Sequence, residues 1–90
     1  MFKTLEELIT VIRQRKESSV EESYTYKLLK NKKLSVEKIK EEIAELIEAI
    51  EKNTNKVHEA ADVLYHLIVL LEANDIKIED VMNELKKRQK

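Results

Sequence analysis

The 90-residue chain contains no glycine and no proline. Tight β-hairpins and sheet bulges depend on glycine and related turn residues, so an all-β fold is excluded. A phosphate-binding loop rich in glycine is excluded on the same ground. The charged residues, 39% of the chain, are numerous enough to supply the polar faces of amphipathic helices. We therefore predict one all-α domain over residues 1–90, a helical bundle of about five helices.

Several classes of function are also excluded. The chain has no cysteine, which removes disulfides and thiolate metal sites. Its net charge of −1 lacks the basic field of nucleic-acid binders, so we expect no nucleic-acid partner. The longest nearly apolar run, residues 63–71, is too short to cross a bilayer, and the first residues do not resemble a signal peptide. We expect a cytoplasmic protein that does not bind membranes.

Helix boundaries follow from asparagine and from residues that cap helices. Without glycine, asparagine is the residue best suited to the left-handed conformation that ends a helix. The predicted stops are Asn31, Asn53 and Asn74. The predicted starts are the capping boxes Thr4–Glu7 and Ser19–Glu22 and the N-caps Ser35 and Asn55. The predicted helices span residues 4–17, 20–30, 36–52, 56–73 and 78–89.

The fourth predicted helix is apolar in nearly every direction. Such a helix is normally buried on all sides, and a chain of this length offers few helices to surround it. A symmetric oligomer with this helix at the subunit interface solves the problem. We therefore predict a homodimer or a dimer of dimers.

Acidic residues share one face on each of the two long helices. Glu59 and Asp62 follow i, i+3 spacing, and Glu42 and Glu45 do the same. In an antiparallel pair joined across residues 53–55, the four carboxylates converge, and a hard divalent cation such as Mg²⁺ or Mn²⁺ relieves their repulsion. A solvated acidic face without a ligand is the alternative interpretation. A di-iron site is excluded, because no glutamate precedes His58 or His66 by three residues.

These residues form the pattern E-E-x-x-E … E-x-x-D, with Glu41-Glu42, Glu45, Glu59 and Asp62, which resembles the all-α nucleoside-triphosphate pyrophosphatase superfamily. Other segments narrow the resemblance to the phosphoribosyl-ATP pyrophosphatases of that MazG-like group. They are Ser23-Tyr24-Thr25 with Lys27-Leu28-Leu29, EAADVLYHLIVLL over residues 59–71, residues 12–16 and the closing residues 79–88. The resemblance covers essentially the whole chain.

The resemblance implies Mg²⁺-dependent hydrolysis of phosphoribosyl-ATP to phosphoribosyl-AMP and pyrophosphate, the second step of histidine biosynthesis, in a dimer. It implies that Mg²⁺ is held by Glu42, Glu45, Glu59 and Asp62. Glu41 and Glu45 are then the candidate catalytic carboxylates, with Glu41 either supporting the metal ligands or orienting the attacking water. The candidate substrate-binding residues are Lys38, Tyr24, Thr25, Lys27 and Arg15. A phosphoribosyl-AMP cyclohydrolase, the next activity in the pathway, is the implied partner.

The roles of three side chains stay open. Lys38 either stabilises substrate phosphates or forms a salt bridge with Glu42 four residues later. For His66 we predict a hydrogen bond near the site or at an interface rather than metal ligation. Tyr65 is expected in the core or at an interface with its hydroxyl bonded.

The chain departs from the phosphoribosyl-ATP family at Lys40, where the family usually has glycine. This difference leaves the acidic pattern intact but bears on substrate identity. Two alternative functions therefore remain: a MazG-like pyrophosphatase acting on canonical or damaged nucleoside triphosphates, and a helical dimerisation module without catalytic activity.

Overall fold

The computed structural model describes residues 1–17 and 23–89, and this part of the chain is all-α without strands. The helices are α1 (Lys3–Glu17), α2 (Tyr24–Lys30), α3 (Lys32–Lys52), α4 (Lys56–Ala73) and α5 (Ile78–Arg88). Helices α1, α4 and α5 agree with the predicted ranges to within one residue at each end. Helix α2 ends at residue 30 as predicted, but it begins at Tyr24 after the N-cap Ser23, and the predicted start at residue 20 lies outside the described residues. The third helix begins four residues earlier than predicted. None of the described helices has the length and apolar character needed to span a bilayer.

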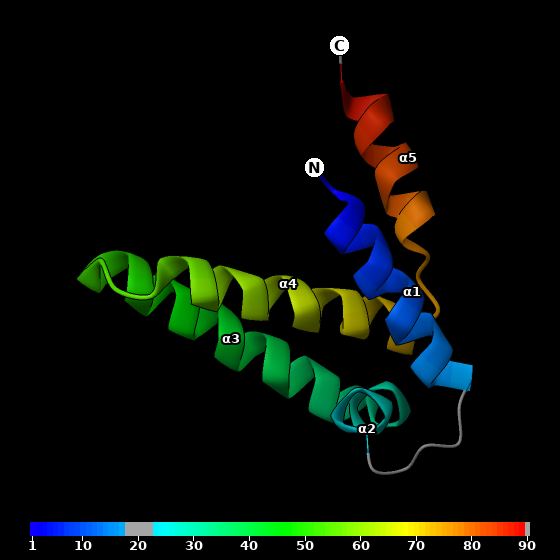
Figure 1. Ribbon diagram of the computed structural model, residues 1–90, viewed down its shortest axis with the longest axis horizontal. Coiled ribbons are helices and arrows are strands. Elements are labelled where there is room, and N and C mark those ends of the chain that lie inside the picture. The colour runs from blue at the N-terminus through cyan, green and yellow to red at the C-terminus, as the bar shows by residue number, and fades with distance from the viewer. Residues whose placement is uncertain (18–22, 90) are drawn as a thin grey trace.

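Helices α3 and α4 form a long antiparallel pair that runs across the molecule (Figure 1). The turn between them places Asn53 and Asn55 in the left-handed conformation, with φ of 56° and 45°. Asparagine tolerates this region better than most residues, which explains how a chain without glycine turns so tightly. The predicted left-handed stop at Asn53 and the start of α4 after Asn55 are confirmed, although the Asn55 side chain makes no capping hydrogen bond.

The other two asparagine stops differ in conformation from the prediction. Helices α2 and α4 do end at Asn31 and Asn74, but these residues have φ of −127° and −105°. After α4 the left-handed position is taken by Asp75, with φ of 58°. Asn31 also caps the start of α3, since its side chain accepts a hydrogen bond from the backbone N–H of Leu34 at 3.0 Å.

Two predicted N-caps were wrong, and a third lies outside the described residues. Ser35 lies inside α3, where it is buried and its hydroxyl donates to the carbonyl of Leu28 at 2.5 Å. Thr4 likewise lies inside α1, which begins at Lys3. The predicted capping box Ser19–Glu22 falls in residues 18–22, which are not described. In the structure Ser23 caps α2 by accepting from the N–H of Tyr26 at 3.3 Å.

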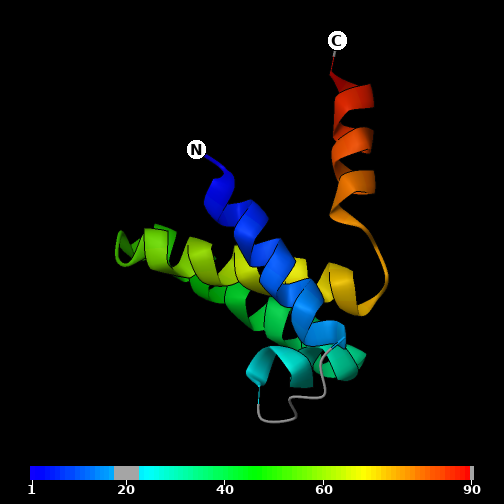
Figure 2. The same ribbon diagram turned by 45° about the vertical axis from the view of Figure 1, so that its right-hand side comes forward.

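The hydrophobic core lies where α1, α2 and the carboxyl-terminal half of α4 meet. It consists of Ile12, Leu28, Leu29, Ile68, Val69 and Ala73. Burying a large aliphatic side chain contributes about 1.5–3 kcal/mol, so this cluster accounts for the packing of the two short helices onto α4. The turn at residues 53–55 lies at the opposite end of the α3–α4 pair (Figure 2). The helical hairpin therefore extends away from the core.

Helix α5 extends away from the α3–α4 pair and contains no buried residue (Figure 1). An ion-pair network connects it to α1. The Arg13 guanidinium binds the buried Glu72 carboxylate at 2.5 Å and Glu79 of α5 at 2.9 and 2.6 Å. Lys16 adds a salt bridge to Asp75 at 2.6 Å. Arginine geometry suits such paired carboxylates, so Arg13 fixes the start of α5 against the rest of the fold.

The prediction that α4 is buried on all sides is not met within the single chain. Several apolar side chains of α3 and α4 remain exposed, among them Ile43, Ile47, Ile50, Leu64 and Leu67. Contiguous exposed apolar side chains on a helix pair are unusual for an isolated domain.

Candidate metal centre

Acidic side chains from α3 and α4 converge near the outer half of the helical hairpin. One carboxylate oxygen each from Glu42, Glu45 and Glu59 lie within 4.8 Å of one another. Asp62 joins through a second group, in which ligand atoms of His58, Glu59 and Asp62 are equally close. We call Glu42, Glu45, Glu59 and Asp62 the acidic cluster. The structure thus brings together the carboxylates that the sequence placed on facing helices.

Two oxygens of the acidic cluster are buried without a partner. Oε2 of Glu42 and Oε2 of Glu59 are inaccessible to solvent and form no hydrogen bond within the described part of the chain. Buried polar atoms are nearly always hydrogen-bonded, so an unpartnered pair on facing carboxylates needs an explanation. A cation between them supplies one.

The electrostatics point the same way. Burial raises the pKa of Glu42, and the neighbouring Glu45 carboxylate raises it further. Burial also raises the pKa of Glu59, again with Glu45 as the main charged contributor. Like charges at short range disfavour ionisation of each group, whereas a divalent cation favours it. An oxygen-only donor set of this kind fits Mg²⁺ or Mn²⁺.

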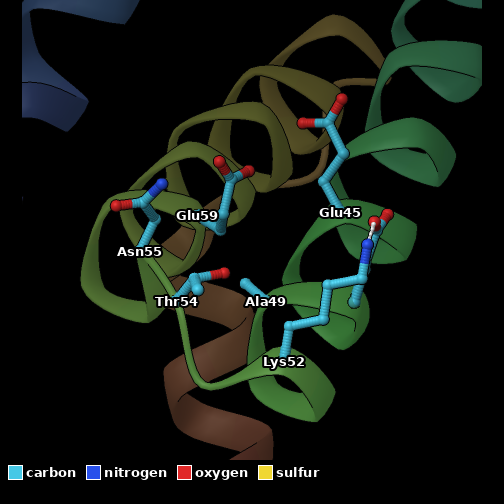
Figure 3. Close-up of a pocket in the computed structure, with 7 residues that line it drawn as sticks. Glu45, Ala49, Lys52, Thr54, Asn55 and Glu59 are labelled. Atoms are coloured by element: carbon cyan, nitrogen blue, oxygen red, sulfur yellow. Dashed lines mark hydrogen bonds and ion pairs between the residues drawn. The ribbon is translucent and has the colours of Figure 1, made fainter.

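A hollow of about 270 Å³ adjoins the acidic cluster at the turn of the hairpin. Glu45 of α3 and Glu59 of α4 stand on opposite sides of it (Figure 3). On the α3 side, Lys52 forms a salt bridge with Glu48 at 2.6 Å. The remaining lining residues are Ala49, Thr54 and Asn55. The carboxylates therefore face a space open to a ligand.

Helix α2 brings Tyr24 and Thr25 against α4. The Tyr24 hydroxyl lies 3.2 Å from Nε2 of His66, and the Thr25 hydroxyl is hydrogen-bonded to the hydroxyl of Tyr65. His66 is buried, and its Nδ1 lies 2.9 Å from the carbonyl oxygen of Asp62. The structure agrees with a hydrogen-bonding role for His66 and with a bonded hydroxyl on Tyr65.

Lys38 lies beside the site but not in the predicted pair. Its ammonium group contacts Glu41 at 3.3 Å, not Glu42, and this hydrogen bond raises its pKa. The three-residue spacing to Glu41 brings the two side chains to the same edge of α3. Glu41 itself is exposed. Both groups remain at the edge of the acidic cluster and carry opposite charges.

The other two predicted substrate-binding residues lie further out. Arg15 is in the last turn of α1 and Lys27 in the last turn of α2, and both are exposed. Among the described residues neither forms an ion pair with the acidic cluster. The structure does not bring these two side chains together with the carboxylates.

Sequence reasoning assigned no role to His58. Its Nε2 lies 3.4 Å from the Asp62 carboxylate, one helical turn away, and the side chain is largely exposed. The i, i+4 spacing of the two residues on α4 was the available signal.

An all-α chain whose helical hairpin gathers carboxylates from both helices around one point has the architecture of a helical hydrolase class that uses acidic residues to hold a metal. The sequence model for "Phosphoribosyl-ATP pyrophosphohydrolase" matches residues 5–89. The chain belongs to this family, as its resemblance in sequence indicated.

Individual relatives agree with the match. The chain is 46% identical to the phosphoribosyl-ATP pyrophosphatase of Clostridium novyi, over 96% of this chain and 81% of that protein. It is 41% identical to the enzyme of the same name from Methanococcoides burtonii, over 94% and 91%. It is also 48% identical to the histidine biosynthesis bifunctional protein HisIE of Pyrococcus furiosus. That alignment takes in 96% of this chain but 41% of the bifunctional protein, so the chain spans less than half of it.

Proposed function

We propose that the chain hydrolyses phosphoribosyl-ATP to phosphoribosyl-AMP and pyrophosphate, with the acidic cluster as its Mg²⁺ site. The observation that carries the proposal is the pair of buried, unpartnered oxygens on Glu42 and Glu59, in a chain of this family. A purely structural acidic face has no need of buried carboxylates that repel one another. Membership of the family supports phosphoribosyl-ATP as the substrate, and the geometry of the acidic cluster supports it as the metal site.

Mg²⁺ would be held by Glu42, Glu45, Glu59 and Asp62. Bound there, it supplies charge neutralisation for the polyphosphate and Lewis acidity at the anhydride. Mn²⁺ has the same preference for oxygen ligands and is expected to substitute for it.

The residues of the chain bind the substrate and accept a proton. Water attacks the α-phosphorus, the bond from that phosphorus to the bridging oxygen breaks, and pyrophosphate leaves. A carboxylate within hydrogen-bond reach takes the proton of the water. Glu45 is our first candidate because it lies between Glu42 and Glu59 and faces the hollow. Glu41, paired with Lys38, is the second.

Positive charge and hydroxyl groups near the cluster are proposed to bind the phosphates and the nucleoside. Lys38 is our first candidate cation, because it lies on the same helix as Glu42 and Glu45 and has Tyr24 and Glu42 among its charged neighbours. The remaining proposed substrate-binding residues are Tyr24, Thr25, Lys27 and Arg15. Lys27 and Arg15 would reach the substrate through their long, flexible side chains.

We further propose that the chain works as a homodimer, or a dimer of dimers, in the cytoplasm. The exposed apolar side chains of α3 and α4 support a second copy as the cover: Ile47 and Ile50 are 52% and 57% exposed. Two-fold dimers are the commonest solution for such a face. The bifunctional relative supports a phosphoribosyl-AMP cyclohydrolase as functional partner. Sedimentation equilibrium at micromolar concentration tests the dimer, and a purely monomeric chain would rule it out.

The experiment for the activity is pyrophosphate release from phosphoribosyl-ATP with and without Mg²⁺, with ordinary nucleoside triphosphates as controls. Metal-dependent release that prefers phosphoribosyl-ATP supports the proposal. Release mainly from nucleoside triphosphates would retain the acidic site and make the chain a house-cleaning pyrophosphatase. No release from any substrate would leave a dimerisation module.

A matched pair of variants locates the activity. Glu45→Gln removes a carboxylate from the acidic cluster, and Glu51→Gln removes one from an exposed position of the same helix. We expect turnover to be nearly abolished in the first and unchanged in the second, with the oligomer intact in both. Wild-type turnover in Glu45→Gln would place the chemistry elsewhere.

A further inference from the structure

Two neighbouring residues of α2 are bonded to two neighbouring residues of α4. Tyr24 pairs with His66, and Thr25 pairs with Tyr65. The His66 ring also packs edge-on against both tyrosine rings, with centroid separations of 6.0 Å to Tyr24 and 5.0 Å to Tyr65. Edge-to-face contacts of this kind are favourable for aromatic rings. Both hydrogen bonds join α2 to α4, and Tyr24 also has Lys38 and Glu42 among its charged neighbours.

The orientation of His66 is determined by the backbone. The carbonyl oxygen of Asp62 can only accept a hydrogen bond, so the Nδ1 atom of His66, 2.9 Å away, carries a proton. In the neutral ring Nε2 is then the acceptor. The Tyr24 hydroxyl, 3.2 Å from Nε2, therefore donates its hydrogen to His66. This leaves only the lone pairs of the Tyr24 oxygen for other partners.

Tyr24 has charged neighbours from the candidate site. Burial raises the pKa of the Tyr24 phenol, with Lys38 opposing the shift and Glu42 adding to it. The phenol thus lies within the electric field of both a proposed phosphate-binding cation and a proposed metal ligand. The ring of Tyr24 is 48% exposed, so a ligand can reach it.

We propose that His66 is a positioning residue that acts through Tyr24: it holds the Tyr24 hydroxyl as a hydrogen-bond acceptor at the edge of the acidic cluster, where the oxygen receives a donor group of the bound nucleotide. This inference rests on the proposed function of the acidic cluster. Thr25 and Tyr65 form the neighbouring hydrogen bond between the same two helices.

Steady-state kinetics of phosphoribosyl-ATP hydrolysis at pH 8, where imidazoles are ordinarily neutral, test the proposal. Tyr24→Phe retains the ring and loses the oxygen. His66→Phe retains the edge-on packing and loses the bond to the Tyr24 hydroxyl. A neutral hydrogen bond is worth about 0.5–1.5 kcal/mol, so each variant should raise KM roughly 3- to 10-fold and change kcat by less than about 2-fold.

A double variant shows whether the two residues act as one unit. If His66 acts through Tyr24, the KM of Tyr24→Phe with His66→Phe should equal that of Tyr24→Phe alone. His66→Gln supplies an acceptor oxygen near the position of Nε2 and should return KM to within about 2-fold of wild type. Multiplied KM effects in the double variant, or no recovery with His66→Gln, would overturn the proposal.

Tyr65→Phe is the matched control, because it removes one hydroxyl bond between the same two helices. A merely structural role for both bonds predicts equal changes in melting temperature and equal kinetics for Tyr65→Phe and Tyr24→Phe. The proposal predicts similar melting temperatures for the two variants but a smaller rise in KM for Tyr65→Phe than for Tyr24→Phe. An inactive wild-type chain would refute the proposed function itself, whereas an active wild type with Tyr24→Phe kinetics unchanged would refute only this inference.

Discussion

Replacing Glu42 by glutamine removes one charge from the acidic cluster while nearly preserving the shape of the side chain. The Glu42 and Glu45 carboxylate oxygens approach within 4.8 Å. Two full charges at that separation repel by roughly 3–4 kcal/mol at an effective dielectric constant of about 20. Glu45 is exposed and solvent screens the pair, so we expect about 1 kcal/mol to remain. In a domain of this size, 1 kcal/mol raises the melting temperature by about 4–8 °C.

The metal-free Glu42→Gln variant should therefore be more stable than the wild type near pH 7.5. The sign follows from the pKa of Glu42, which is raised above its ordinary 4.5 chiefly by burial. A carboxyl with a raised folded-state pKa loses stability as pH rises from the ordinary value through the raised one. The stability gap between variant and wild type should thus narrow as pH falls through the raised pKa of Glu42, because the protonated carboxyl no longer carries a charge.

Mg²⁺ should reverse the ranking. At 100 times its dissociation constant a ligand stabilises the folded state by about 2.7 kcal/mol, so the wild type should gain stability with Mg²⁺ and Glu42→Gln should gain little. Turnover of the variant should fall at least 100-fold, since changes to groups that merely support metal ligands already cost roughly 10- to 100-fold.

Differential scanning fluorimetry with and without Mg²⁺, at several pH values, measures these effects beside an activity assay. Glu51→Gln, on the same helix but exposed, is the control and should behave as wild type throughout. The reasoning is refuted if metal-free Glu42→Gln melts below the wild type, or if Mg²⁺ stabilises both equally.

Three further predictions concern the fold. Hydrogen bonds from Arg13 hold the pKa of Glu79 at about 2 rather than 4.5, so the stability contributed by this pair is complete above pH 4.5 and lost as pH falls toward 2. When the melting temperature is measured as a function of pH, Glu79→Gln should reduce its fall between pH 4.5 and about 2. An unchanged fall would show that the Arg13–Glu79 pair contributes nothing to stability. Replacing the fully buried Leu28 by alanine should lower the free energy of unfolding by about 2–5 kcal/mol, measured by urea unfolding. A loss below about 1 kcal/mol would contradict its place in the core. Ser35→Ala should cost about 1 kcal/mol through the lost bond to the Leu28 carbonyl. No loss of stability in that variant would mean that water replaces the bond.

The features that sequence predicted well depend on local regularity. The ends of α4 were predicted correctly because Asn55 and Asn74 stand directly before and after it. The convergence of Glu42, Glu45 and Glu59 followed from the helical period and from one short turn. Both inferences needed only residues close together in the chain.

The features that sequence missed depend on contacts between distant residues. The start of α3 was wrong because Ser35, an excellent N-cap in isolation, is instead used to satisfy the Leu28 carbonyl in the buried corner between α2 and α3. Lys38 had two acidic neighbours at suitable spacing, and helix geometry alone did not distinguish Glu41 from Glu42. The pairing of Arg13 with Glu72 joins residues 59 positions apart, and no local pattern reports it.

The distance between the acidic cluster and the hydrophobic core has a consequence for the dynamics of α4. Its carboxyl-terminal half packs against α1 and α2, whereas its first turns lie beside α3 at the end of the hairpin away from those two helices (Figure 2). Amide protons in the two halves of this one helix should therefore exchange with solvent at very different rates, with the slow half at Ile68 and Val69 and the fast half around Glu59. A ligand bound at the acidic cluster would then mainly hold α3 and α4 together at the outer end of the hairpin. Without the ligand, this end would open and close while the rest of the protein stays folded.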